Sequence, residues 1–127
     1  MVDDTPNPTP AELEILRLLW REPGLTVREV HDRLTGKSTG YTTALKTMQI
    51  MLEKRLVKRE PIGKAHKYFA LIPQAQVQGS LVRDLLDRAF EGASRNLVLR
   101  ALSERRPSSD ELAEIRQMLD QLEDESK

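Results

Sequence analysis

The chain has 127 residues and no net charge, with 31% charged residues, 4% aromatic residues and no cysteine. That length suits one ordinary domain or a compact domain with a helical appendage, and a core this short of aromatic residues suits small helices better than a large sandwich or barrel. Without cysteine the chain can form no disulfide, thiolate metal site or cysteine nucleophile.

The N-terminal part of the chain predicts a short tail and a well-delimited helix. Residues 1–8 contain two acids and two prolines without periodicity, which is typical of a flexible tail. Residues 9–12, Thr-Pro-Ala-Glu, combine an N-cap threonine, a proline at the first helical position and a glutamate three residues after the cap. Pro23-Gly24 should end this helix, and residues 25–27 can add a short strand segment. The predicted apolar side consists of Leu13, Leu16, Leu19 and Trp20.

Two further helices follow. A second capping box, residues 26–29, opens the first of them, and Gly36 should stop it. Residues 37–41 form a polar linker, and the next helix is expected to start at Thr42 or Thr43 and to run to Leu56. The apolar residues of the two helices are Val27, Val30, Leu34, Ala44, Met48, Met51, Leu52 and Leu56.

The side of the third helix opposite its apolar residues has the features of a DNA-reading surface. It begins with Thr42 and Thr43, at the helix end that approaches base edges most closely, and continues with Lys46 and Gln49. Gln can pair with adenine, Thr and Leu45 can contact a thymine methyl, and Lys can contact guanine or a phosphate. The alternative is a plain amphipathic helix with a solvated polar side.

Residues 57–70 alternate like two strands of a hairpin, with the tip at residues 63–65. Pro61 lacks the amide proton that a central strand needs, so the first strand should lie at a sheet edge. Residues 42–70 carry seven basic and two acidic residues, a net charge of +5, which favours a polyanion site. The alternative is a structural wing that only covers the core. The candidate phosphate contacts in the hairpin are Arg59, Lys64, His66 and Lys67.

From Pro73 onward only helical patterns remain, three of them, the last opened by a capping box at Ser108. We therefore expect one domain at residues 9–72 and a helical domain at residues 73–127. Three short helices cannot each hide an apolar face in so small a chain, so they either fold back on the first domain or pair with a second copy. We favour the second copy, because a two-fold dimer would present two recognition helices to a palindromic site. The apolar residues expected in that dimer are Leu81, Leu85, Phe90, Leu97, Leu112, Ile115, Leu119 and Leu122.

No motif in the sequence indicates an enzyme. The serines lack a GxSxG elbow, and neither GxxxxGK[ST] nor GxGxxG occurs. His31 and His66 are the only histidines and have no carboxylate at metal-ligand spacing, so no metal or other cofactor is expected. No apolar run approaches the roughly 18 residues of a membrane helix, and no signal peptide pattern is present, so we expect a cytoplasmic protein without membrane insertion.

Four blocks of the sequence, in order, carry a family resemblance: PTPAELEILRLLW, TVREVHDRL, YTTALKTMQIMLEKRLVKRE and GKAHKYFAL. They resemble the BlaI/MecI/CopY family, the penicillinase repressors, over roughly residues 9–125. The resemblance implies a mainly α fold with a small antiparallel β wing, in which a winged helix-turn-helix domain is followed by a three-helix dimerisation domain. It also implies a homodimeric transcriptional repressor that binds inverted-repeat operators in double-stranded DNA. The DNA contacts that it implies are the helix start at Thr42 and Thr43, the groove at Lys46 and Gln49, the wing at Lys64 and Lys67, and the backbone near Thr26.

The sequence departs from the family pattern in two places. Copper-sensing members carry paired CxC motifs, and this chain has no cysteine, so copper sensing of that type is excluded. The β-lactam-responsive members are inactivated by cleavage of an Asn–Phe bond, where this chain has Arg100-Ala101. Whether a membrane sensor-protease relays the inducing signal to this protein is therefore left open.

Two other functions compete with the repressor. The main alternative is a winged-helix module whose basic face binds an acidic protein partner, and such a module would show no preference among DNA sequences. A repressor with a small-molecule site in its dimer interface is a weaker alternative, because ligand pockets are usually lined by aromatic side chains and this chain has few.

Overall fold

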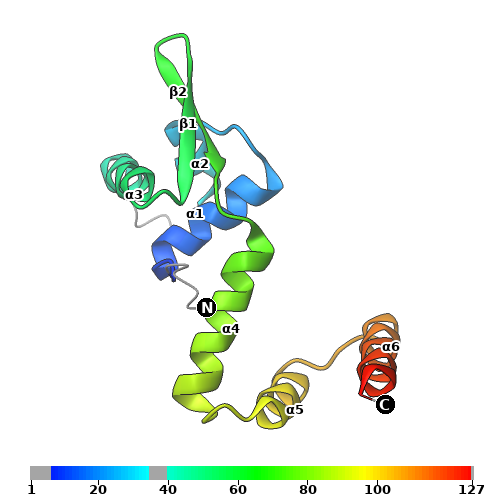
Figure 1. The fold of residues 1–127 in the computed structure, drawn as a ribbon. Helices are drawn as coiled ribbons and strands as arrows, with labels where there is room; N and C mark the ends of the chain where they lie inside the picture. The colour runs from blue at the N-terminus through cyan, green and yellow to red at the C-terminus, as the bar shows by residue number, and fades with distance from the viewer. Residues whose placement is uncertain (1–6, 35–39, 127) are drawn as a thin grey trace. The chain divides into compact units, whose positions relative to one another are not determined.

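The computed structural model describes residues 7–34 and 40–126. Along the chain the elements are α1 (Pro10–Arg21), α2 (Val27–Arg33), α3 (Tyr41–Glu53), β1 (Val57–Ile62), β2 (Ala65–Ala70), α4 (Gln74–Ala89), α5 (Ser94–Glu104) and α6 (Ser109–Glu125) (Figure 1). This architecture confirms the expected mainly α fold with a small antiparallel β hairpin. The expected helix stop at Gly36, most of the expected linker and most of the expected N-terminal tail lie outside the described residues.

The chain divides into two compact units between Arg83 and Asp84, inside α4. The boundary expected from the sequence lies earlier, between residues 72 and 73. The division into a domain at residues 9–72 and a helical domain at residues 73–127 remains a prediction. Val77 explains the difference in position, because it is fully buried in the core of the first unit, so the first turn of α4 completes that core.

Helix α1 begins and ends where its local sequence predicts. Thr9 accepts a hydrogen bond from the amide of Glu12 and donates its own amide to the Glu12 carboxylate, which completes the capping box. After Arg21 the chain turns at Gly24, whose φ of +86° is a left-handed conformation that glycine adopts without strain. The indole of Trp20 donates a hydrogen bond to the carbonyl of Ile72 at 3.0 Å, which holds the end of α1 against the segment before α4.

The predicted apolar side of α1 was incomplete. Leu16 and Leu19 are buried, but Leu13 and Trp20 are only half-buried, and Ile15 takes their place in the core. Leu13 and Trp20 pack against the edge of the core, whereas Ile15, Leu16 and Leu19 lie inside it.

Helices α2 and α3 form the helix pair that carries the candidate reading surface. Thr26 and Glu29 close the expected capping box at the start of α2. Helix α3 begins at Tyr41 with Gly40 as its N-cap, one or two residues before the predicted start, and ends at Glu53 rather than at Leu56. It ends early because Arg55 adopts a φ of +62°, which turns the chain toward β1, so Leu56 joins the core from outside the helix.

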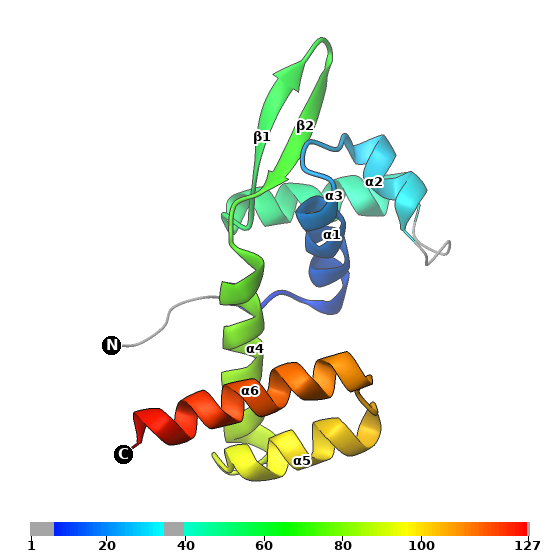
Figure 2. The ribbon, with the colours of Figure 1, turned by 90° about the vertical axis from the view of Figure 1, so that its right-hand side faces the viewer.

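Strands β1 and β2 form an antiparallel hairpin in which Arg59 lies opposite Tyr68 and Pro61 opposite His66. The connecting loop is Gly63-Lys64, one residue shorter than predicted, with Gly63 at a φ of +60° as the first residue of a two-residue hairpin loop requires. Leu25 pairs with Tyr68 on the other side of β2, so β1 is the edge strand among the described residues, as Pro61 predicted. Figure 2 shows the hairpin extending away from α1, α2 and α3.

The core of the first unit lies between α1, α2, α3, the base of the hairpin and the start of α4. Its largest fully buried side chains come from elements far apart in the sequence, so packing, rather than any single helix, holds the unit together. They are Tyr68, Leu16, Leu19, Met48, Met51, Leu56, Val30 and Val77.

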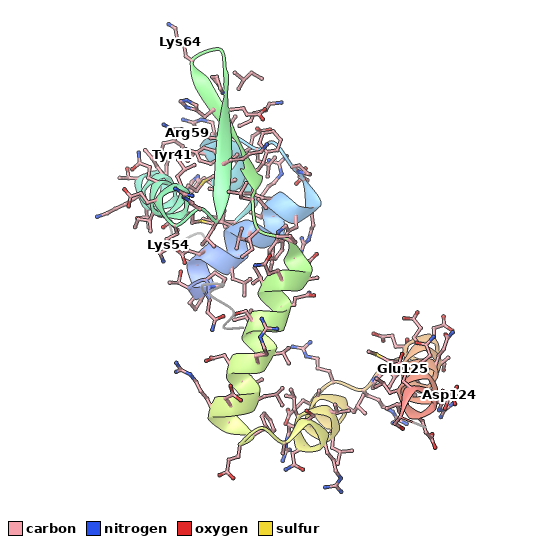
Figure 3. The ribbon with its side chains drawn as sticks, viewed as in Figure 1. Tyr41, Lys54, Arg59, Lys64, Asp124 and Glu125 are labelled. Carbon is pink, nitrogen blue, oxygen red and sulfur yellow. The ribbon has the colours of Figure 1, made fainter. Side chains whose placement is uncertain are left out.

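An ion pair between Glu12 and Lys54 lies at the edge of this core. Glu12 is 2% exposed, and its carboxylate accepts a hydrogen bond from Lys54 Nζ at 2.8 Å. Burial by itself raises the pKa of Glu12, but the hydrogen bonds from Lys54 and Thr9 outweigh it and leave that pKa below its ordinary value of 4.5. Because Lys54 directly follows α3 (Figure 3), its ion pair with Glu12 ties the end of the candidate reading helix to the start of α1.

The second unit consists of the end of α4 and the helices α5 and α6. Gly92, at a φ of +79°, follows α4, and Ser108 caps α6 through the expected capping box with Glu111. Arg100 and Ala101 lie inside α5. Neither α5 nor α6, both fully described, contains a buried residue. Leu97, Leu102, Leu112 and Ile115 are half-buried, whereas the other large apolar side chains of the two helices are exposed among the described residues.

Candidate nucleic-acid interface

The outward side of α3 is mainly polar, with one exposed apolar residue, Ile50. Thr42, Thr43, Lys46 and Gln49 are all exposed, whereas Ala44, Met48 and Met51 are buried on the opposite side. The Thr47 hydroxyl donates to the Thr43 carbonyl at 2.9 Å, so Thr47 serves the helix backbone while the Thr43 side chain remains on the surface. This surface has the size and chemistry of a helix face that enters a major groove.

A hollow of about 240 Å³ lies where the start of α2, the start of α3 and the hairpin meet. We call it the basic hollow, because four cationic or titratable basic side chains line it. Its lining residues are Thr26, Val27, Arg28, Tyr41, Leu45, Arg59, Lys64, Ala65, His66 and Tyr68. Five of the ten predicted DNA contacts, Thr26, Leu45, Arg59, Lys64 and His66, thus come together at one place.

An aromatic and cationic cluster forms one side of the basic hollow. The guanidinium of Arg28 lies over the ring of Tyr41, 5.2 Å from its centroid. The ring of His31 meets Tyr41 edge-on, with centroids 6.1 Å apart and an interplanar angle of 82°. Since Arg28 and His31 belong to α2 and Tyr41 begins α3, the cluster fixes the first turn of α3 against α2.

The predicted phosphate contact at Thr26 has a second task in the fold. Its amide donates to the Glu29 carboxylate at 3.0 Å, and its hydroxyl accepts from the Glu29 amide at 3.2 Å. The hydrogen bond from the Thr26 backbone lowers the pKa of Glu29, so this carboxylate stays ionised at neutral pH. Thr26 therefore already uses both its amide and its hydroxyl at the start of α2.

The two faces of the hairpin carry different groups. Arg59, His66 and Tyr68 line the basic hollow, and Lys64 is at the hairpin tip (Figure 3). Lys67 lies on the other face, as the alternation of a strand requires, and is half-buried. Lys58 also lies there, with its ammonium 5.5 Å from the centroid of the Phe69 ring and 3.6 Å from the Glu60 carboxylate. The structure therefore does not bring Lys67 into the basic hollow.

Leu45 and Lys54 contribute less to this surface than their positions in the sequence suggest. Leu45 is half-buried against the core and also lines the hollow, so only part of it faces outward. Lys54, although it belongs to the basic block of the sequence, has its charge compensated by Glu12. The effective positive charge of this side of the protein therefore comes from the start of α2, the middle of α3 and the hairpin.

Sequence reasoning missed three residues of this surface: Arg28, Tyr41 and Ile50. The residue pattern assigned Tyr41 to the linker, although the family resemblance placed it at the start of the recognition helix, and Arg28 was read only as an interior residue of a capping box. Ile50 is 38% exposed although apolar, and it belongs to α3. Two features of the sequence could have identified Tyr41 and Ile50. Tyr41 stands directly before the two threonines, and Ile50 is an apolar residue outside the apolar stripe of the helix.

The described residues show neither a metal site nor a membrane span. Within residues 7–34 and 40–126, no three His, Asp or Glu side chains converge as metal ligands would. In the same ranges, no helix combines the length and the apolar character that crossing a bilayer requires.

Known proteins of similar sequence or fold agree with this geometry. The chain is 24% identical to the penicillinase repressor of Bacillus licheniformis over 123 residues, which cover 96% of each chain. It is 19% identical to the methicillin resistance regulatory protein MecI of Staphylococcus aureus (strain N315), over 86% of this chain and 89% of MecI. The solution structure of the DNA-binding domain of the repressor BlaI superimposes with a TM-score of 0.51 at 18% identity, over 59% of this chain and 93% of that domain.

The structural likeness to the BlaI domain shows that the first unit has the winged-helix fold, in which the hairpin is the wing. The family model of the penicillinase repressor matches residues 8–121, almost the whole chain. The protein therefore belongs to the penicillinase repressor family, whose members are DNA-binding transcriptional repressors and not enzymes.

Proposed function

We propose that the protein represses transcription as a homodimer on an inverted-repeat operator, with α3 in the major groove and the wing along the flanking backbone. The observation that carries the proposal is the position of the basic hollow directly beside the polar face of α3. Cations beside a helix in the groove hold it in register through phosphate contacts, and side chains that reach base edges make its binding sequence-specific.

The two parts of the surface would do different work. Arg28, Arg59 and Lys64 would neutralise phosphates, so binding should weaken steeply with salt, by about 0.9 in the log–log slope for each phosphate contacted. Thr42, Thr43, Lys46 and Gln49 would face base edges, where each good contact contributes about 1–3 kcal/mol of discrimination. Ile50 adds an apolar group suited to a thymine methyl.

The second unit supports the homodimer. Leu85, Leu119 and Leu122, all expected in the dimer interface, are 45%, 56% and 51% exposed in the single chain. A soluble protein seldom leaves a series of leucines uncovered, and a second copy would cover them through an isologous interface. Two copies related by a two-fold axis would then present two recognition helices to the two halves of a palindrome.

The direct test is a titration of labelled DNA from the region upstream of the protein's own gene, against scrambled DNA of equal length, at two salt concentrations. Tight, salt-sensitive binding that prefers the upstream DNA, with two protomers per site, is the expected result. Equal and weak binding to both DNAs would contradict the proposal and favour the alternative, a basic face that binds an acidic protein.

Replacing Thr43 by alanine should relax sequence preference, whereas replacing Lys64 should weaken binding to every DNA. In the variant the carbonyl of residue 43 still accepts the hydrogen bond from the Thr47 hydroxyl, so only the exposed hydroxyl and methyl of Thr43 are lost. The expected loss for Thr43→Ala is about 1–3 kcal/mol on the operator and little on scrambled DNA. Lys64→Ala should reduce the salt slope by about 0.9 on both. Competition titrations measure both quantities, and equal losses of Thr43→Ala on both DNAs would reject this division of roles.

Arg28→Ala should lower the affinity for operator and scrambled DNA alike by about tenfold, roughly 1.4 kcal/mol, and should reduce the salt slope by about 0.9. Arg28 lines the basic hollow and lies over Tyr41, so it is held in place before DNA arrives. Arg17→Ala is the matched control, because Arg17 is an exposed arginine of α1 that lines a different surface. If both variants lost the same affinity, net charge and not the basic hollow would explain the effect.

A further inference from the structure

The helices of the second unit carry opposite charges. Residues 94–106, which comprise α5 and the start of the following connection, contain four arginines and one glutamate, a net charge of +3. Helix α6 contains seven acids and one arginine, a net charge of −6. The net charge of −3 for residues 71–127 therefore conceals a basic helix followed by a strongly acidic one.

Each of these helices also has an uncovered apolar side. On α5, Val98 and Leu99 are 48% and 51% exposed, and on α6 the exposed side is marked by Met118, Leu119 and Leu122. At helical spacing, the acids Glu114 and Glu125 border one edge of the α6 apolar side and Glu123 borders the other. Any helix that covers the α6 apolar side therefore meets two carboxylates at one edge, and Glu123 beside Arg116 at the other.

Pairing of α6 with α6 of a second copy would place these carboxylates against each other. Like charges that flank a helix–helix seam destabilise the pair, whereas opposite charges select partner and orientation. The last turn of α6 adds further unfavourable negative charge, since Asp124 and Glu125 stand at the negative end of the helix dipole, where cations are favoured (Figure 3). Cations from another helix would relieve both effects.

We propose that in the dimer α6 of one protomer packs against α5 of its partner, so that each apolar side is covered by a helix of opposite charge. This inference rests on the proposed homodimer and adds which helices meet. Arginines of the basic segment, among them Arg105 and Arg106, would then face the acids of the partner's α6, and the two-fold axis would repeat the contact. The pairing would also explain why the two helices of one chain leave their apolar sides uncovered.

Cross-linking tests the pairing directly, because the chain has no cysteine and each introduced thiol is unique. Val98→Cys and Leu119→Cys are produced together in one cell, with tags of different size, and treated with a short bismaleimide. The expected product joins the Val98→Cys chain to the Leu119→Cys chain, and each variant alone gives little. Gln121→Cys replaces Leu119→Cys as the control, since Gln121 lies on the opposite side of α6, and should give little product with Val98→Cys.

Three results would overturn the pairing. Self-cross-linking of either variant that exceeds the mixed product would show that like helices meet. Dimers by mass that give no mixed product would show that neither position lies at the interface. A monomeric mass for the unmodified protein would refute the proposed homodimer as well, so the two proposals fail in distinguishable ways.

A charge reversal supplies a second readout with opposite signs for the two arrangements. Glu123→Lys combined with Glu125→Lys should weaken dimerisation about tenfold if α6 meets the basic segment of the partner, and adding Arg105→Glu and Arg106→Glu should restore it in part. If α6 meets α6, the first pair of substitutions removes repulsion and strengthens the dimer. Sedimentation at low salt measures the dissociation constant, and a strengthened dimer would overturn the proposal.

Discussion

Replacing Leu119 by glutamate is expected to turn the protein into a monomer and to lower its affinity for an inverted-repeat operator at least a hundredfold. Leu119 is 56% exposed in the single chain, so the substitution leaves the fold of each chain intact. It places a charge in the middle of the apolar side of an already acidic helix. A dimer that engages two half-sites gains about 10²–10⁴ in avidity over one winged-helix domain, and the monomer loses that gain.

Mass measurement by sedimentation and an operator titration check this expectation together. Gln121→Glu is the matched control, because it adds the same charge to the same helix on the opposite side, and it should leave both mass and affinity near those of the unmodified protein. A monomeric Leu119→Glu that still binds the operator with full affinity would show that dimerisation does not contribute to DNA binding. If Leu119→Glu stays dimeric, Leu119 lies outside the dimer interface.

Lys54→Met is expected to cost on the order of 2 kcal/mol of unfolding free energy at neutral pH, by leaving a buried charge unpaired. The Glu12 side chain is 3% exposed and that of Lys54 is 42% exposed, so removing the lysine strands the carboxylate, whereas removing the carboxylate returns the lysine to water. Glu12→Gln should therefore cost less, because its amide oxygen can still accept from the Thr9 amide. Denaturant unfolding measures both, with Lys46→Met on the exposed side of α3 as the control.

The stability of the unmodified protein and that of Lys54→Met should depend on pH in different ways. The pKa of Glu12 is lowered in the folded protein, so the ionised carboxylate contributes stability that is present above its ordinary pKa of 4.5 and is lost as pH falls through the folded pKa. Without Lys54, burial that raises the pKa is less opposed, and the carboxyl can protonate at higher pH. The gap in stability between Lys54→Met and the unmodified protein should therefore narrow from pH 7 to pH 3, and a constant gap would contradict this origin.

The local features of the fold could be read from the sequence because each depends on residues that are close along the chain. Thr9, Thr26 and Ser108 cap their helices through a side chain and a backbone amide only three residues apart, so the pattern by itself specifies the helix start. The hairpin follows in the same way from alternation around Gly63 and from the missing amide proton of Pro61. Family resemblance then added the winged-helix arrangement, which periodicity alone did not show.

The start of α3 shows where local reading stops. Two threonines in succession look like caps, yet Gly40 takes the cap position and Tyr41 becomes the first helical residue. The ring of Tyr41 lies between Arg28 and His31 of α2, and those contacts, which span ten residues or more, accompany the earlier start. A helix boundary that depends on side chains of another helix does not appear in a sequence window.

The sequence by itself determined the caps, the hairpin, the polar side of α3, the basic block and the apolar residues of the last three helices. Only the tertiary structure decided that Glu12 is buried and paired with Lys54, 42 residues away, and that Arg28 and Tyr41 join the basic hollow while Lys67 does not. The physical reason is that capping and alternation act within a few residues. Burial and charge pairing, in contrast, depend on which distant side chains share a surface, and that is settled only when the elements pack.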